Sequence, residues 1–126
     1  AVLEHVNNLK NTYKAMYYWL KPNGYVSHEI DFRMHGLLMN KKWDIHWTYT
    51  DFVWKLVKGN RRYFINREPF SRHLKLLKEE GFKINFTKRE IIDSTIERQS
   101  LAPAFKNLNP SDLKTSTGFI QAIKTN

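Results

Sequence analysis

The chain has 126 residues, of which 41% are hydrophobic and 14% aromatic, enough for one globular domain with one core and too apolar for a disordered chain. Lys and Arg number 21 against 12 Asp and Glu, and a net charge of +9 favours either anionic partners or, as we prefer, a solvated basic face. Cysteine is absent, which excludes disulfides and thiolate metal sites and suits a cytoplasmic location, and no apolar run reaches the ~20 residues of a membrane span.

The first predicted element is an amphipathic helix that begins near the cap residues Asn7 and Asn8. Its apolar positions recur at steps of three and four. They are Val6, Leu9, Tyr13, Met16, Tyr17 and Leu20. Pro22-Asn23-Gly24 ends the helix and turns the chain, and the run from Tyr25 to Phe32 predicts a strand.

The predicted strand at 25–32 carries unusual polarity. Its alternation places Val26, His28, Ile30 and Phe32 on one face and Ser27, Glu29 and Asp31 on the other. Because a central parallel strand is normally almost all apolar, polar residues near its end suggest that this end opens into a site. We therefore take His28 and Asp31 as candidate catalytic residues. The alternative is an edge strand with one side in water.

Residues 33–67 form a divergent segment with a cluster of rings. Trp43 and Trp47 can stack on a flat or sugar-like acceptor, and the imidazole of His46 between them can serve as a catalytic base. His35 joins the substrate-binding candidates, within an apolar run at 34–39 that suits a short helix or lid. The spacing of the histidines matches no familiar zinc pattern, so no metal site is predicted. Ordinary packing of the two tryptophans is the alternative.

A short helix is predicted at Phe52–Val57, capped by Thr50 and ended by Gly59. A basic turn and a brief β-like run at Tyr63–Ile65 follow it. Arg61 and Arg67 flank that run as substrate-binding candidates, because a guanidinium can hold a phosphate or a carboxylate through two hydrogen bonds. Solvated surface arginines are the alternative.

The later elements follow from simpler signals. A helix is predicted at Phe70–Glu80 between Pro69 and Gly81, then an alternating strand at Phe82–Phe86. Ile91, Ile92 and Ile96 suggest one or two helical turns, and Pro103 to Phe105 suggests a turn packed on the core. Asn109-Pro110 starts a short helix, and Gly118–Lys124 is the last strand.

Several of these stretches together resemble class I S-adenosylmethionine-dependent methyltransferases. Val2-Leu3-Glu4-His5-Val6 resembles the family's motif after its fourth strand, and Leu20 to Tyr25, with Asn23 in place of the commoner glycine, resembles the turn before its fifth. Residues 76–84 resemble the family's next helix and sixth strand, and residues 118–124 its closing strand. The resemblance covers most of the chain, with a divergent middle.

The resemblance implies an α/β fold, the C-terminal half of a Rossmann-like domain, in which the closing strand lies antiparallel between the fifth and sixth. It implies S-adenosylmethionine as cofactor, contacted near Leu3, Glu4 and His5, and a small-molecule acceptor bound through residues 33–67. No G-x-G cofactor loop is present in these residues. We therefore expect residues 1–126 to be one partial domain that is inactive alone and self-associates through an uncovered sheet edge.

One alternative comes from another class, a noncatalytic basic module that binds nucleic acid or a protein partner. Phosphates would meet Lys and Arg, and bases would stack on the aromatic rings. This interpretation has no recognisable binding motif behind it, and it leaves the ordered series of helix-turn-strand matches unexplained.

Overall fold

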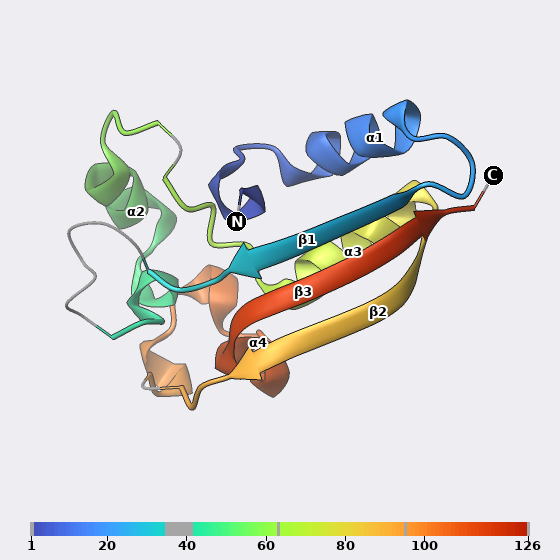
Figure 1. The fold of residues 1–126 in the computed structure, drawn as a ribbon. Helices are drawn as coiled ribbons and strands as arrows, with labels where there is room; N and C mark the ends of the chain where they lie inside the picture. Colours follow the sequence, from blue (N-terminus) through green and yellow to red (C-terminus); the bar gives the residue numbers. More distant parts are fainter. Residues whose placement is uncertain (1, 35–41, 63, 95, 126) are drawn as a thin grey trace.

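A three-stranded sheet forms the centre of the molecule (Figure 1), and the computed structural model describes residues 2–34, 42–62, 64–94 and 96–125. The strands are β1 (Tyr25–Asp31), β2 (Phe82–Ile91) and β3 (Thr115–Lys124). Their order is β1-β3-β2, and both outer strands run antiparallel to β3, so β1 and β2 are parallel to each other. The helices and 3-10 turns are η1 (Leu3–His5), α1 (Leu9–Trp19), η3 (Ile45–Thr48), α2 (Asp51–Lys58), α3 (Phe70–Glu80), η4 (Arg98–Ser100), η5 (Pro103–Phe105) and α4 (Pro110–Lys114).

The helix α3 packs against β2 and β3, and α1 packs against α3, so both cover the same side of the sheet. The core between them is apolar and continuous. It is formed by Leu9, Tyr13, Val26, Ile30, Leu76, Leu77, Phe82, Ile120 and Ala122, with Leu3, Phe32 and Phe70 at one end. The predicted split of the first strand is confirmed, since Val26 and Ile30 are buried while Ser27 and Glu29 are exposed.

Local signals set the ends of the predicted helices, and the structure confirms them. The side chain of Asn8 accepts a hydrogen bond from the backbone N–H of Asn11 at 3.0 Å, and that of Thr50 accepts one from Val53 at 3.3 Å. Gly81 closes α3 at φ 107°, in the left-handed region that favours glycine. Asn109 caps α4 by accepting from the N–H of Asp112 at 2.7 Å.

The predicted antiparallel pairing of 82–86 with 118–124 is confirmed, and both strands are longer than expected. The helical turn predicted around Ile91 and Ile92 is wrong. Ile91 ends β2 opposite Thr115, and the N–H of Ile92 donates to the carbonyl of Lys114 at 2.8 Å. Cross-strand hydrogen bonds therefore extend the sheet through a stretch whose apolar pair suits helix and strand equally.

Two other predicted segments differ or lie outside the described residues. Phe64 and Ile65 are buried but belong to no strand, so the β-like run predicted there is wrong in the part that is described. His35 and the rest of the run at 35–41, predicted as a helix or lid, lie outside the described residues. None of the described helices is long and apolar enough to cross a membrane.

Gly118 of β3 lies directly against the ring of Phe70 in α3. A Cβ atom built there would lie 2.5 Å from two ring carbons of Phe70, in a ring that also contacts Phe32 at a centroid distance of 5.9 Å. We expect Gly118→Ala to lower the free energy of unfolding by about 1–3 kcal/mol, because the two rings must shift. Urea denaturation measures this. Thr117→Ala, on the opposite face of β3, should change stability by less than about 0.5 kcal/mol, and equal losses would contradict this packing.

Candidate functional site

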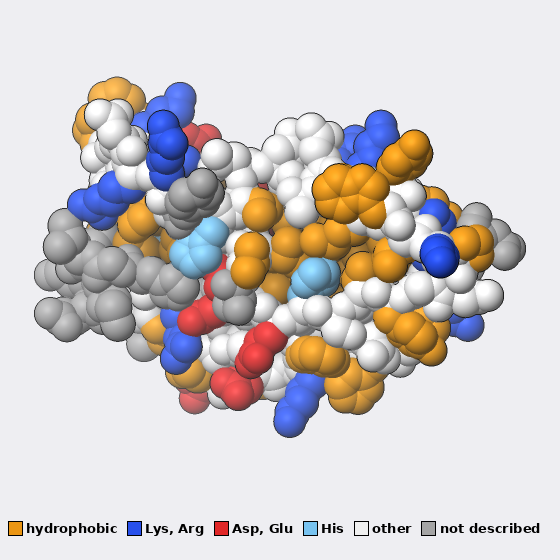
Figure 2. Space-filling view, turned by 45° about the horizontal axis from the view of Figure 1, so that its top comes forward, with side chains coloured by type: hydrophobic (Ala, Val, Ile, Leu, Met, Phe, Trp, Pro, Cys, Tyr) orange, Lys and Arg blue, Asp and Glu red, His pale blue; other side chains and the backbone are white. Residues whose placement is uncertain are grey.

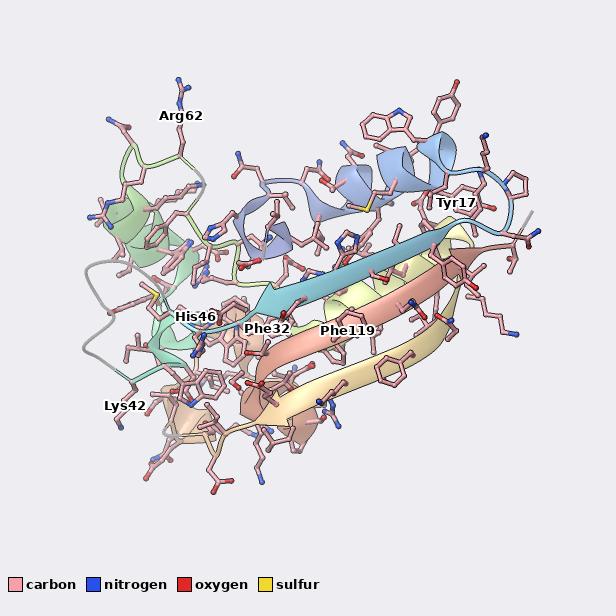
Figure 3. All side chains as sticks on the ribbon, viewed as in Figure 1. Tyr17, Phe32, Lys42, His46, Arg62 and Phe119 are labelled. Atoms are coloured by element: carbon pink, nitrogen blue, oxygen red, sulfur yellow. The ribbon has the colours of Figure 1, made fainter. Side chains whose placement is uncertain are left out.

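A small cavity lies at the carboxyl end of β1, where four separate segments converge. Glu4 comes from η1, Asp31 from the end of β1, His46 from η3, and Arg67 and Glu68 from the loop before α3. Its volume of about 10 Å³ leaves room for roughly one water molecule. Figure 3 shows His46 beside Phe32 at this end of the strand. The cavity thus brings together candidates predicted for the cofactor, for catalysis and for the substrate.

Glu4 is the most unusual residue of this cavity. It is only 4% exposed, and within the described part of the chain neither carboxylate oxygen has a hydrogen bond; the Oε1 atom lies 3.9 Å from Nε2 of His5. Burying a carboxylate without hydrogen bonds costs several kcal/mol, on the order of 2–7 for a polar group without compensation. The carboxylate is therefore placed to accept hydrogen bonds from a ligand.

Asn66 holds η1 in this position. Its side-chain Nδ2 donates to the carbonyls of Leu3 and Val6 at 2.8 and 2.9 Å, and its backbone N–H donates to the carbonyl of Glu4 at 2.7 Å. These three hydrogen bonds therefore hold the loop before α3 against η1. Leu3, predicted to contact cofactor, is 2% exposed and packs in the core, so only its backbone faces polar partners.

Asp31 forms a two-point ion pair with Arg33. The Nε and Nη2 atoms of Arg33 lie 2.9 and 2.8 Å from the two carboxylate oxygens, and the backbone N–H of Arg33 donates to the same carboxylate at 3.0 Å. This hydrogen bond raises the pKa of Arg33. Asp31 is therefore a compensated carboxylate that can orient a ligand, and a weaker choice for a proton acceptor than an unpaired group.

His46 is 1% exposed and lies with its ring centroid 4.6 Å from that of Trp47. Its backbone carbonyl accepts a hydrogen bond from the Nη1 atom of Arg67 at 3.2 Å. His46 lines the same small cavity as Glu4 and Asp31. This places a candidate base next to the two acidic candidates, enclosed by protein.

Arg67 ties the surrounding elements together. Its backbone has φ 64°, and its guanidinium donates to the carbonyl of Tyr49 at 2.6 Å and to Asp51 Oδ1 at 2.9 Å. The guanidinium carbon lies 4.7 Å from the Trp54 ring centroid and 4.8 Å from that of Phe105. Burial lowers the pKa of Arg67 although Asp51 opposes this. The guanidinium of Arg67 therefore binds groups of the protein itself. Arg61, by contrast, is exposed.

The two tryptophans predicted to bind the acceptor are held by packing. Trp47 is 1% exposed, packs with Leu101 and Leu113, and donates from Nε1 to the carbonyl of Arg67 at 3.1 Å. The half-buried Trp43 meets Trp47 edge-on at a centroid distance of 6.1 Å. The two rings therefore belong to the small core that η3 contributes to. This agrees with the alternative stated from the sequence, that both tryptophans serve ordinary packing.

His28 does not line the cavity. Its ring lies on the face of β1 that α1 covers, 6.4 Å from the ring of Tyr13, and burial lowers the pKa of His28. Tyr13 in turn forms a 2.7 Å hydrogen bond with Nδ1 of His73, which is fully buried. His28 therefore belongs to a buried group between α1, α3 and β1, separate from Glu4 and His46.

Glu68 and Asn66 were not among the predicted site residues. Burial raises the pKa of Glu68, although Arg72 lies 3.4 Å away and opposes the shift. The signal in the sequence was the polar run Asn66-Arg67-Glu68 before Pro69, which is typical of an ordinary helix start.

No protein-family model matches the chain, and no curated protein is similar enough to count as a match.

Proposed function

We propose that this chain is the C-terminal half of a class I S-adenosylmethionine-dependent methyltransferase domain acting on a small-molecule or sugar-like acceptor. The strand order carries the proposal. A last strand that lies antiparallel between two mutually parallel strands is the order that the sequence resemblance implies. The helices α1 and α3 lie on one side of that sheet. Asn23 adds support, because it adopts φ 66° where the resembling turns carry glycine.

The position of the cavity supports the same proposal. Open α/β sheets bind ligands outside the carboxyl ends of their parallel strands. Glu4, Asp31 and His46 meet at the carboxyl end of β1. A buried carboxylate such as that of Glu4 suits the hydroxyl or amino groups of a bound cofactor, since it can accept their hydrogen bonds.

The reaction that we propose is an in-line displacement. S-adenosylmethionine, held near Glu4 and His5, would supply the methyl group to a lone pair of the acceptor's oxygen or nitrogen and would leave as S-adenosylhomocysteine. The acceptor's proton passes to a base, for which His46 is the candidate. The enzyme contributes mainly by holding the two reactants in line.

Calorimetry with S-adenosylmethionine tests the cofactor assignment. The assay uses the full product of the gene, which we call the encoded protein. Glu4→Gln should weaken cofactor binding by about 10- to 100-fold, the loss expected for hydrogen bonds to a charged group. Glu79→Gln, on the exposed surface of α3, is the matched control and should bind as the wild type does.

Residues 1–126 alone should show no binding at micromolar cofactor, because they lack the glycine-rich loop of the family. Micromolar cofactor binding by residues 1–126 alone would show that binding does not require the glycine-rich loop. Absence of binding by the encoded protein would contradict the cofactor assignment itself.

A further inference from the structure

Two large aromatic side chains lie in solvent at the carboxyl end of α1. Tyr18 is 82% exposed and Trp19 is 77% exposed, the highest values among the described large hydrophobic residues. Within the described part of the chain, neither ring stacks on another ring and neither polar tip has a hydrogen bond. Two adjacent rings of this size in water are typical of a surface that binds something.

The helix end that carries these rings is firmly held. The Nζ atom of Lys124 donates to the carbonyls of Tyr17 and Leu20 at 2.6 and 2.8 Å. The ring of Tyr17 meets that of Phe82 edge-on at a centroid distance of 5.2 Å. Successive helical residues are turned by about 100°, so the two residues after Tyr17 point away from the core side. The exposed rings are therefore presented on a fixed base.

The exposed side of α1 is also basic. Lys10, Lys14 and Tyr18 are spaced four residues apart and are all exposed, so they follow one face of the helix. Lys21 follows in the turn, and residues 5–28 contain no Asp or Glu. Within the described ranges none of these three lysines forms an ion pair. Figure 2 shows hydrophobic and basic side chains together at the upper right, over the end of α1.

We propose that this side of α1 docks the protein onto an anionic lipid surface. Tyr18 and Trp19 enter the headgroup layer, which favours rings that carry a polar tip, and the lysines meet lipid phosphates. A lysine close to an anionic membrane strengthens binding by about fivefold. This docking does not depend on methyl transfer, and a strand added at the open edge of β1 would extend the sheet without covering the outer side of α1.

Shape and composition favour a lipid surface over another macromolecule. Single-stranded nucleic acid stacks its bases on rings within a basic groove that follows the phosphates, whereas these rings lie on the outer side of a helix. Protein interfaces are depleted in lysine, whereas here lysines lie on both sides of the ring pair in the sequence. A flat anionic surface meets both features at once.

Co-sedimentation of the encoded protein with vesicles tests the docking. Vesicles of phosphatidylcholine with about one-third phosphatidylglycerol should bind at least about tenfold more tightly than phosphatidylcholine alone, because only the former attract lysine. Brominated lipid should quench tryptophan emission, and Trp19→Phe should remove most of that quenching, since Trp47 and Trp54 are buried. Absence of binding to the mixed vesicles, or quenching that Trp19→Phe leaves unchanged, would overturn the proposal.

A pair of ring variants identifies the surface. Tyr18→Ser with Trp19→Ser should weaken vesicle binding by about tenfold or more. Phe52→Ser with Leu56→Ser is the matched control on α2, because those side chains are 72% and 68% exposed on a helix that also carries lysines, and it should bind as the wild type does. Thermal unfolding checks that both variants stay folded. Equal losses in the two variants would overturn the proposal, and so would a vesicle-free dimer that the first variant abolishes.

A pair of lysine variants separates local from general charge. Lys10→Gln with Lys14→Gln should weaken binding to the mixed vesicles by about tenfold or more. Lys55→Gln with Lys58→Gln makes the same change in net charge on α2, at the other end of the molecule from the rings (Figure 1). It should change binding by less than about threefold, because distant exposed charges are screened by salt. Equal losses would contradict docking through α1.

Discussion

Replacing His46 with alanine in the encoded protein is expected to lower turnover by about 10²- to 10⁴-fold, the usual contribution of a general base. His46 lines the same cavity as Glu4 and Asp31 at the carboxyl end of β1, and its imidazole is the candidate to take the proton of the acceptor. Cofactor affinity should stay unchanged, because the proton is removed from the acceptor. The rate is measured as release of S-adenosylhomocysteine with a small-molecule extract of the source cells as the acceptor pool.

A packing role for His46 predicts a different outcome. The residue is 1% exposed, so its truncation also opens a cavity and lowers stability. Added imidazole should restore part of the turnover of His46→Ala if a base is missing, and it should not do so if only packing is lost. Full turnover in the folded variant would exclude His46 as the base and move the search to Asp31 or to groups outside these residues.

Acidification is expected to unfold the protein through His73. Burial, helped by nearby His28, lowers the pKa of His73 to about 3, against an ordinary value of 6.5. In the unfolded chain His73 therefore binds a proton below pH 6.5, whereas in the folded chain it stays neutral down to about pH 3. Stability is complete above pH 6.5 and falls by up to roughly 1.4 kcal/mol per pH unit below it. Urea denaturation from pH 7 to pH 4 measures the slope.

A double substitution tests this assignment. Tyr13 and Nδ1 of His73 share one 2.7 Å hydrogen bond, so Tyr13→Phe with His73→Leu removes both partners together, which is close to neutral when the shapes are kept. Its stability should fall less steeply below pH 6.5 than that of the wild type. Carboxylates elsewhere contribute equally to both proteins. Parallel pH profiles would show that other groups cause the acid sensitivity.

The elements that could be predicted were those with local signals. Asn8, Thr50 and Asn109 cap their helices through hydrogen bonds within three residues of themselves, so the sequence nearby contains the information. Ile91 could not be assigned in this way. It becomes part of β2 because Thr115 lies opposite it, and that partner is distant in the chain.

The site was predictable as a set of residues and not as an arrangement. Asp31 was predicted from polarity at a strand end, Glu4 from the family resemblance and His46 from its place between two tryptophans, and the fold brings the three to one cavity. Arg67 was expected to face a substrate, yet its guanidinium is used to join η3, α2 and η5. Nothing local signals this role, because a left-handed arginine backbone and partners 13 to 38 residues away depend on the complete fold.

The most direct test of the methyltransferase proposal is a structure of the encoded protein with bound S-adenosylhomocysteine. We predict that the ligand lies at the carboxyl end of β1, in contact with η1 (Leu3–His5), and that a further parallel strand pairs with the open edge of β1. Binding at another part of the sheet, or a β1 edge covered by anything other than a parallel strand of the same domain, would contradict the proposal.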